Sequence, residues 1–139
     1  MGLFTLHTNT QMHRDIAPKN IFLHEDVVGG SKELIAKLGD FGLARDLKLS
    51  ELRGGLFSQV GTPIYFSPEL LDGTYNIASD MWAIGVTLYQ MLSQKLPFMP
   101  TMDSILHDTP AELPDYVPLV IKSLVKGLLE KNPRERITC

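Results

Sequence analysis

The sequence contains a single cysteine, Cys139. A disulfide framework within the chain and a metal site built only of cysteines are therefore excluded, and this composition favours an intracellular protein, cytoplasmic or nuclear. No run of 18 or more apolar residues occurs, because the longest candidate, residues 81–92, is interrupted by Gly85, Thr87 and Gln90. A membrane-spanning helix is therefore not predicted. The first residues also lack the basic region and apolar run of a secretory signal.

Basic residues are not in excess either: 13 Lys and Arg stand against 16 Asp and Glu, a formal net charge of −3. Without a basic run or an alternation of basic and aromatic residues, neither nucleic acid nor a membrane is predicted as a partner. Apolar residues make up 44% and charged residues 21%, as in an ordinary soluble globular protein rather than a disordered one. The length of 139 residues suffices for one domain with a sizeable core.

Hydrophobic patterning predicts a short antiparallel hairpin near the start of the chain. Residues 2–7 resemble the tail of a helix, and residues 21–23 and 34–38 have the composition of strands. The Gly-Gly-Ser sequence at 29–31 is the predicted turn, so that the two short strands are joined by a long loop. Residues 40–69 show little periodicity, and a loop of that length in a compact domain is usually functional or disordered.

The rest of the chain is predicted to be helical. Ser79 and Asp80 are expected to cap a helix that runs to about Leu92 and is apolar on every side, hence buried all round. A short, poorly determined stretch at 102–107 follows, and the last helix spans roughly residues 119–130. Its apolar stripe consists of Val120, Ile121, Leu124, Val125, Leu128 and Leu129. The fold class is therefore mainly α: a helical bundle with a small antiparallel β-hairpin.

Two short motifs carry groups suited to chemistry. The tripeptide His-Arg-Asp ends in Asp15, and Asn20 follows five residues later. The carboxylate can orient a hydroxyl and accept its proton, and the amide oxygen can help to hold a divalent ion. A second tripeptide, Asp-Phe-Gly, begins with Asp40 directly after the second predicted strand, where a carboxylate is a good Mg²⁺ ligand. Taken singly, a solvated loop and an ordinary turn explain these motifs equally well.

Three further motifs follow in a fixed order. Gly-Thr-Pro at 61–63 leads to Ser-Pro-Glu at 67–69, Asp-Met-Trp-Ala-Ile-Gly at 80–85 opens the apolar helix, and Asn-Pro-Arg-Glu-Arg stands at 132–136. Together the five motifs resemble the C-terminal lobe of the α+β fold of eukaryotic protein kinases, and they cover essentially the whole chain. Thr62 matches the serine/threonine type, and the wording of the motifs is most similar to the NIMA-related group. Ser67 stands where the family usually has Ala.

The resemblance implies a catalytic role for several residues. Asp15 would be the catalytic base, and Thr62 would hydrogen-bond to it. Asn20 and Asp40 would hold the two Mg²⁺ ions that bridge the phosphates of ATP. Phe22 would form the apolar floor beneath the adenine. The substrate would be a protein with a Ser or Thr hydroxyl.

Other residues would have structural roles by the same resemblance. His13 and Phe41 would stack as the lower half of an apolar spine. Glu69 and Arg136 would form a buried ion pair, whose disruption at one partner typically costs ~3–5 kcal/mol. Asp80 would hold the catalytic loop through backbone hydrogen bonds.

A regulatory role is implied for three residues. Arg14 precedes the catalytic Asp, which in this family marks enzymes regulated by phosphorylation of the activation loop. Arg45 stands where a second phosphate-binding cation often lies, and Ser58 is at the usual modification position. We hypothesise that a phosphate on Ser58 is bound by Arg14 and Arg45 and orders the loop. The alternative is an unmodified loop serine.

The sequence departs from the family pattern at several places. Ala17 stands where serine/threonine kinases carry a Lys that contacts the transferred phosphoryl group. Lys19 stands where tyrosine kinases place an Arg; it could restore the positive charge, but it lacks the fork geometry of Arg. Whether Lys19 compensates for Ala17 is left open. Residues 24–32 are interpreted as a long surface insertion, and residues 97–114 are short for the substrate-side helix of the family.

The 139 residues contain no Gly-rich phosphate loop and no strand Lys paired to a helix Glu, both of which the family uses. We therefore expect residues 1–139 to be the C-terminal lobe alone, without the N-lobe and the final helix. It would belong to a serine/threonine kinase and be inactive alone, with the missing lobe or a regulatory protein as partner. The alternative is a non-catalytic kinase-like scaffold. An exposed apolar patch around Phe22 and Phe41 is also expected, with poor solubility.

Overall fold

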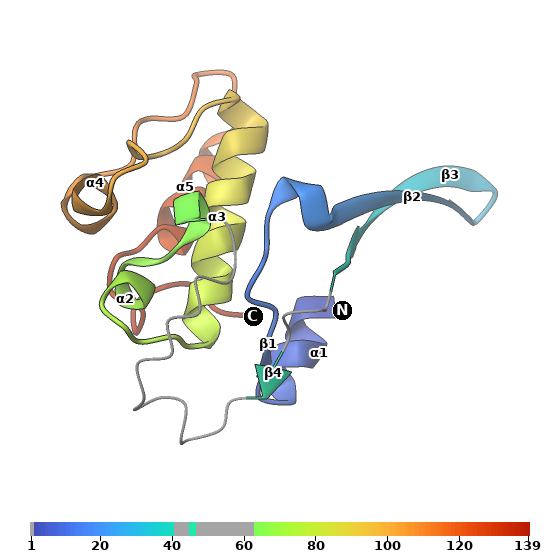
Figure 1. The fold of residues 1–139 in the computed structure, drawn as a ribbon. Coiled ribbons are helices and arrows are strands. Elements are labelled where there is room, and N and C mark those ends of the chain that lie inside the picture. Colours follow the sequence, from blue (N-terminus) through green and yellow to red (C-terminus); the bar gives the residue numbers. More distant parts are fainter. Residues whose placement is uncertain (1, 41–44, 47–62) are drawn as a thin grey trace.

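The computed structural model describes residues 2–40, 45–46 and 63–139. The described part is mainly helical with a small antiparallel hairpin, so the predicted fold class is confirmed (Figure 1). In chain order its elements are α1 (Gly2–Thr8), β1 (Gln11–Met12), the 3-10 turn η1 (Pro18–Asn20), β2 (Ile21–Val28), β3 (Ser31–Leu38), β4 (Arg45–Asp46), the 3-10 turn η3 (Pro63–Tyr65), α2 (Pro68–Leu71), α3 (Ile77–Ser93), α4 (Met102–His107) and α5 (Leu119–Leu128).

Helix α3 is the centre of the helical part, and α2, α4 and α5 lie on one side of it (Figure 1). As the sequence predicts, it is buried nearly all round, and Met91 is its only exposed residue. The core around it consists of Trp82, Val86, Tyr89, Phe98, Ile105, Leu113, Val117, Val125 and Leu129. Within this core the rings of Trp82 and Phe98 stack at 5.4 Å. The predicted cap, Ser79 with Asp80, was wrong, because α3 begins at Ile77.

The actual cap of α3 is Asn76, in a capping box. The Asn76 side chain accepts a hydrogen bond from Ala78 N at 2.8 Å, and Ser79 Oγ accepts from Asn76 N at 3.4 Å. Asn is as good a cap as Ser, and a hydroxyl three residues later completes the box. Ser79 therefore takes part in the capping box as the third residue of the helix, and it is not the N-cap itself.

Only the second half of the α5 stripe is buried. Val125, Leu128 and Leu129 pack into the core, whereas Val120 is 78% exposed. Helices α3 and α5 approach closely at Gly85, where an added Cβ would lie 2.9 Å from Leu128 Cβ. In the first half of α5 only Ile121 among the stripe residues packs against this core, and Leu119 and Val120 are exposed.

The hairpin differs from its prediction. Strands β2 and β3 pair continuously from Ile21 with Leu38 to Val28 with Ser31, and only Gly29 and Gly30 form the turn. The predicted long loop over residues 24–32 is therefore wrong. Both glycines have positive φ, +59° and +85°, which is the conformation that a two-residue hairpin turn requires and that Gly adopts without strain. The hairpin projects away from the helices (Figure 1), and no described helix is long and apolar enough to cross a membrane.

Candidate functional site

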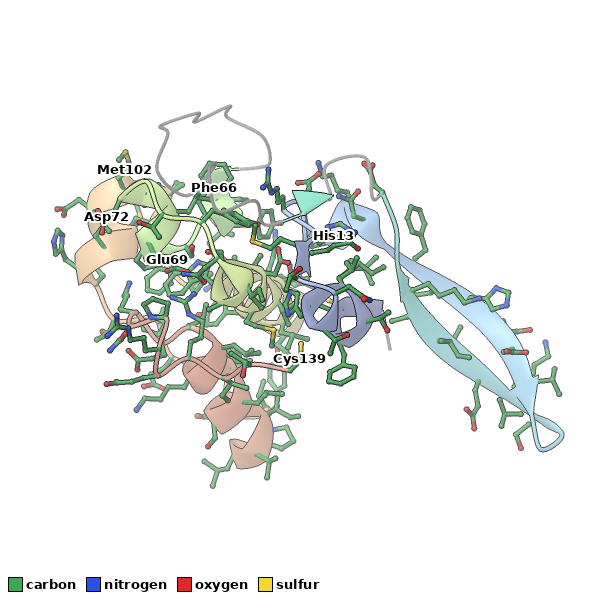
Figure 2. All side chains as sticks on the ribbon, turned by 90° about the horizontal axis from the view of Figure 1, so that it is seen from below. His13, Phe66, Glu69, Asp72, Met102 and Cys139 are labelled. Carbon is green, nitrogen blue, oxygen red and sulfur yellow. The ribbon has the colours of Figure 1, made fainter. Side chains whose placement is uncertain are left out.

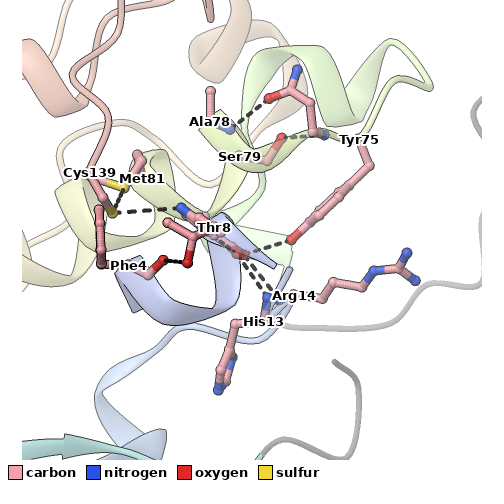
Figure 3. Close-up of polar contacts among 12 residues, drawn as sticks. Phe4, Thr8, His13, Arg14, Tyr75, Ala78, Ser79, Met81 and Cys139 are labelled. Carbon is pink, nitrogen blue, oxygen red and sulfur yellow. Dashed lines mark hydrogen bonds and ion pairs between the residues drawn. The ribbon is translucent and has the colours of Figure 1, made fainter. Parts of the chain in front are cut away.

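The site is anchored by Asp80, a buried carboxylate in the first turn of α3. Its Oδ2 accepts a hydrogen bond from His13 N at 2.8 Å, and its Oδ1 accepts from Arg14 N at 3.0 Å (Figure 3). Arg14 has a φ of +71°, a left-handed conformation that is costly for a residue with a Cβ. The two bonds from Asp80 therefore hold the segment 13–20 in a conformation that it would not adopt alone.

Two further residues reach Asp80, and the sequence analysis missed both. Tyr75 donates its hydroxyl to Asp80 Oδ1 at 3.1 Å, and His7 Nε2 lies 3.0 Å from Asp80 Oδ2. The Tyr75 ring also lies 5.5 Å from the guanidinium of Arg14. Burial, and then the charge of Asp80, raise the pKa of Tyr75 well above its usual value, so the hydroxyl keeps its proton. Neither residue lies in a motif, and no sequence signal distinguishes them from ordinary loop and helix residues.

Asp15 is the centre of the next group of contacts. The turn η1 begins with Pro18, whose ring favours the first position of a helical turn, and it directs the next two side chains back to Asp15. Asn20 Nδ2 donates to the Asp15 backbone oxygen at 2.7 Å and to Asp15 Oδ2 at 2.9 Å. Lys19 Nζ lies 2.8 Å from the same Oδ2. The structure therefore brings Asp15, Lys19 and Asn20 together, and the Asp15 Oδ1 atom has no such contact among the described residues.

Lys19 is the only cation that the described residues bring to Asp15. Ala17 is buried and extended, with φ −159° and ψ 161°, so its position points into the interior. The Lys19 side chain is 58% exposed, and its hydrogen bond to Asp15 raises the pKa of the ammonium, with the charges of Asp15 and Asp40 acting in the same direction. Lys19 is therefore charged at neutral pH.

Asn20 and Asp40 share the near end of the hairpin. Asn20 O accepts a hydrogen bond from Gly39 N at 2.9 Å, one step beyond the last strand pair. The fully buried His13 ring lies 2.9 Å from Gly39 O through Nε2, which ties the residue before Asp40 to the helical part. Figure 2 shows His13 where the helices and the hairpin meet. Asp40 itself is exposed and has a φ of +58°.

These two residues fit a Mg²⁺ site completed by phosphates. Both amide hydrogens of Asn20 are directed to Asp15, which leaves its Oδ1 to act as a ligand, and the exposed carboxylate of Asp40 at the same end of the hairpin would supply a second ligand. Mg²⁺ prefers such hard oxygens, and it commonly takes only one or two protein ligands together with substrate phosphates. The described residues contain no group of three or more His, Cys, Asp or Glu that could hold a metal on its own.

Phe22 lies beside Gly39, with a side chain that is 56% exposed. An added Cβ at Gly39 would lie 2.5 Å from the Phe22 ring, so the ring covers the backbone directly before Asp40. Three predicted site residues, Phe41, Ser58 and Thr62, lie outside the described residues. Arg45 pairs with Met12 through β4 and β1, but only its backbone is described.

Glu69 and Arg136 form a buried two-pronged ion pair, with N–O distances of 2.6 and 2.9 Å. Ser79 Oγ donates to the same carboxylate at 2.8 Å. Burial alone would raise the pKa of Glu69, but the hydrogen bonds and charge of Arg136 outweigh it, and the pKa is lowered. Arg136 also donates to three backbone carbonyls, those of Ala78, Glu130 and Lys131. The pair ties α2 to the C-terminal segment.

Comparison with known proteins identifies related chains. The family model described as Protein kinase domain matches residues 1–139. Serine/threonine-protein kinase Nek1 of Toxoplasma gondii is 43% identical over 136 residues, covering 90% of this chain and 8% of the relative. Serine/threonine-protein kinase Nek3 of Oryza sativa is 39% identical over 98% of this chain and 23% of the relative. Serine/threonine-protein kinase fused of Drosophila melanogaster is 37% identical over 99% of this chain and 16% of the relative. The chain thus spans less than a quarter of these relatives, and the two Nek kinases agree with the predicted resemblance.

Proposed function

We propose, from the premise that this chain belongs to the protein kinase family, that it forms part of a serine/threonine kinase. The reaction would transfer the γ-phosphoryl group of ATP to Ser and Thr hydroxyls of protein substrates. The observation that carries the proposal is the Asp15 carboxylate, held through Oδ2 by Asn20 and Lys19. A pure scaffold has no need to orient a carboxylate in this way beside two metal-ligand candidates.

Asp15 acts as the base in this proposal. Its Oδ2 is held by Asn20 and Lys19, so Oδ1 is the atom that accepts the proton of the substrate hydroxyl. Asn20 Oδ1 and the Asp40 carboxylate would hold Mg²⁺, which neutralises phosphate charge when bound. Phe22, exposed at the near end of the hairpin, would support the adenine. Thr62 would bind Asp15 from the segment that the structure does not describe.

In this proposal the ammonium of Lys19 supplies the positive charge that Ala17 cannot provide. Its ammonium is 2.8 Å from Asp15 Oδ2, close enough to neutralise part of the negative charge that gathers near the base during transfer. An ammonium can act there as a point charge, although it does not reproduce a guanidinium fork. We therefore assign Lys19 a catalytic role beside Asp15 and Asn20.

The transfer requires further protein. A loop over the phosphates and a Lys paired to a Glu are needed on the other side of the nucleotide, and these 139 residues contain neither. We propose that an N-lobe or a regulatory protein supplies them, and that residues 1–139 alone bind ATP weakly and do not transfer phosphate. Arg14 and Arg45 would bind a phosphate on Ser58 in the complete enzyme.

Radiolabelled phosphate transfer by the full-length protein tests the proposal. Asp15→Asn should lower kcat by about 10²- to 10⁴-fold, the usual contribution of a positioned base. Lys19→Met should also lower kcat, Lys19→Arg should retain part of it, and Lys95→Met, at an exposed lysine far from Asp15 in sequence, serves as the matched control. Full activity in Asp15→Asn would contradict the proposal. Mass spectrometry that never finds phosphate on Ser58 in the native cell would contradict the regulatory part.

The second candidate is a kinase-like binding module without catalysis, and buried Ala17 is the observation that favours it. Such a module would bind its partner protein equally well with Asp15→Asn and Asp40→Asn. It would show no phosphate transfer in the full-length wild type. Transfer that depends on Asp15 excludes this candidate.

A further inference from the structure

Cys139 lies against two side chains that, like its own thiol, bind soft metal ions. Its Sγ is 3.6 Å from His7 Nδ1 and donates a hydrogen bond to Met81 Sδ at 3.4 Å (Figure 3). His7 belongs to α1, Met81 belongs to α3 and Cys139 ends the C-terminal segment, so the fold brings the three donors together. A thiolate and a thioether are the soft ligands that select Cu(I), and an imidazole also suits copper.

The ring of His7 has the orientation of a metal ligand. Its Nε2 lies 3.0 Å from Asp80 Oδ2, and Asp80 also accepts hydrogen bonds from two backbone N–H groups and one hydroxyl. Because Asp80 acts as the acceptor, the ring hydrogen is at Nε2, and the lone pair of the neutral ring is at Nδ1, facing Cys139. Metal-binding histidines almost always donate their other ring hydrogen in this way. The His7 side chain is 7% exposed, which holds the ring in this orientation.

The spacing of the donors also suits a single ion. Thiolate sulfur and imidazole nitrogen bind such metals at about 2.3 Å and 2.0–2.1 Å, so two donors at tetrahedral to trigonal angles lie about 3.6–4.0 Å apart. The distance from Cys139 Sγ to His7 Nδ1, 3.6 Å, lies within this range. The distance to Met81 Sδ, 3.4 Å, is slightly shorter, and a small rotation of the exposed Cys139 side chain would lengthen it.

The kind of donors distinguishes Cu(I) from Zn²⁺. Structural Zn²⁺ sites almost always have four ligands, drawn from Cys, His, Asp and Glu. The part of the chain that the structure describes offers no group of three such side chains. Met81 is 6% exposed and supplies a thioether, which is a ligand for Cu(I) rather than for Zn²⁺. One thiolate, one thioether and one imidazole therefore favour Cu(I).

We propose that His7, Met81 and Cys139 bind one Cu(I) ion, at a site separate from the residues around Asp15. Partial burial raises the pKa of the Cys139 thiol, so the thiol keeps its proton until the ion arrives. On binding, the S–H bond breaks, the thiolate forms the copper–sulfur bond and the proton passes to solvent, while copper stays in the Cu(I) state. The bound ion joins α1 and α3 to the C-terminal segment. This inference does not depend on the proposed function.

Anaerobic titration of the full-length protein with Cu(I), in competition with a Cu(I)-specific chelator, tests the site. Cys139→Ser should bind one Cu(I) fewer than wild type. Met81→Leu nearly conserves the side-chain volume but lacks the sulfur. It should weaken binding of this ion at least about tenfold, because loss of even an outer partner of a metal ligand costs about 10–100-fold. Met91→Leu, at an exposed methionine of the same helix, is the matched control and should bind as wild type does.

X-ray absorption provides a second readout. The extra Cu(I) that wild type binds relative to Cys139→Ser should have two sulfur neighbours and one nitrogen neighbour, and in Met81→Leu it should have one sulfur fewer. Circular dichroism of the metal-free variants should match that of wild type, which separates loss of a ligand from loss of the fold.

Three results would overturn the inference. These are equal numbers of bound Cu(I) in wild type and Cys139→Ser, equal affinities in Met81→Leu and Met91→Leu, and Zn²⁺ that displaces Cu(I) from the site. Phosphate transfer is not measured in this experiment, so an inactive enzyme would refute the proposed function and leave the copper site unaffected.

Discussion

Helix α3 and the β2–β3 hairpin are each stabilised in a different way. All residues of α3 except Met91 are buried or partly buried, and Trp82 near its middle is fully buried. On the hairpin, Leu23 is 68% and Leu34 is 70% exposed. Burying one large apolar side chain contributes about 1.5–3 kcal/mol, so the helical part is stabilised by its core. Apart from contacts of β3 with α1 and the bond from His13 at Gly39, the described hairpin is held by its own ladder, its Gly-Gly turn and the exposed Glu25–Lys32 pair at 2.7 Å.

This difference decides how firmly each half of the candidate site is held. Asp15 belongs to the helical part through Asp80, whereas Asp40 follows the last residue of β3. An isolated two-stranded hairpin is marginally stable, and an exposed pair such as Glu25–Lys32 contributes ~0–1 kcal/mol. The hairpin should therefore open locally without unfolding the helices. The bond from His13 to Gly39 is what keeps Asp40 near Asp15 when the distal strands open.

The largest effect is expected from Arg136→Met in the helical part. The substitution leaves the Glu69 carboxylate buried without its partner, which costs about 3–5 kcal/mol of unfolding free energy. Urea denaturation measures it, with Arg134→Met at an exposed neighbour as the control. Because the pKa of Glu69 is lowered, the pair stabilises the protein above the usual glutamate value of 4.5. That contribution is lost as the pH falls through the lowered pKa. Equal stability of both variants at pH 7 would contradict this prediction.

A smaller loss is expected from Gly85→Ala, which tests a close contact between α3 and α5. The new Cβ would lie 2.9 Å from both Leu128 Cβ and Leu129 Cδ2, and overpacking of this kind costs about 1–3 kcal/mol. Gly127→Ala, where the nearest atoms belong to the partly exposed Ile137 side chain, should cost less. Thermal and urea unfolding compare the two, and a larger loss for Gly127→Ala would contradict the prediction.

The pH dependence of stability should differ between a variant of Lys131 in the helical part and a variant of Lys32 in the hairpin. Lys131 lies 3.9 Å from the Phe98 ring centroid and donates to Ile105 O, and burial lowers its pKa from 10.5 to about 8. Between these values the unfolded chain binds more protons than the folded one, so stability rises with pH. This rise should disappear in Lys131→Met and persist in Lys32→Met on the hairpin. A pH dependence unchanged by Lys131→Met would refute it.

The smallest effect on global stability is expected from Leu34→Thr in β3. The side chain is mostly exposed and its neighbours are strand residues, so the change should stay within about 0.5 kcal/mol. Amide hydrogen exchange along 23–36 should nevertheless become faster, while the amides of α3 keep their protection. Simultaneous loss of protection in α3 would show that the hairpin and the helices unfold as one unit.

The motifs and the long helices could be predicted from the sequence because their signals are local. His-Arg-Asp, the amide of Asn20 and the apolar run of α3 can each be recognised within a few residues. The hairpin itself was predicted correctly, but its long loop was wrong because exposed strands carry no clear alternation, and residues 24–28 therefore resemble a loop. The true cap, Asn76, was missed because Ser79 also has a capping side chain. The apolar stripe of α5 was predicted, but periodicity does not reveal which of its residues meet a partner, and Val120 is exposed while Val125 is buried.

The contacts that His7 and Tyr75 make with Asp80 could not be predicted in this way. His7 lies 73 residues from Asp80 in the sequence, and Tyr75, although only five residues away, reaches Asp80 across the N-terminus of α3. A hydroxyl or an imidazole in a polar loop has many possible partners, and only the folded arrangement selects one. Ala17 and Lys19, by contrast, were recognised as a departure, and the structure added the 2.8 Å contact to Asp15.

The four contacts of Asp80 also have a consequence for the order of folding. Its partners His7, His13 and Arg14 lie 73, 67 and 66 residues away in the sequence. Contacts of such separation form only after the intervening chain has closed into a loop. The 13–20 segment should therefore acquire its conformation late, after α3 has formed and docked. In a refolding experiment with pulsed amide labelling, His13 and Arg14 should gain protection after the amides of α3, and Asp80→Asn should delay them further.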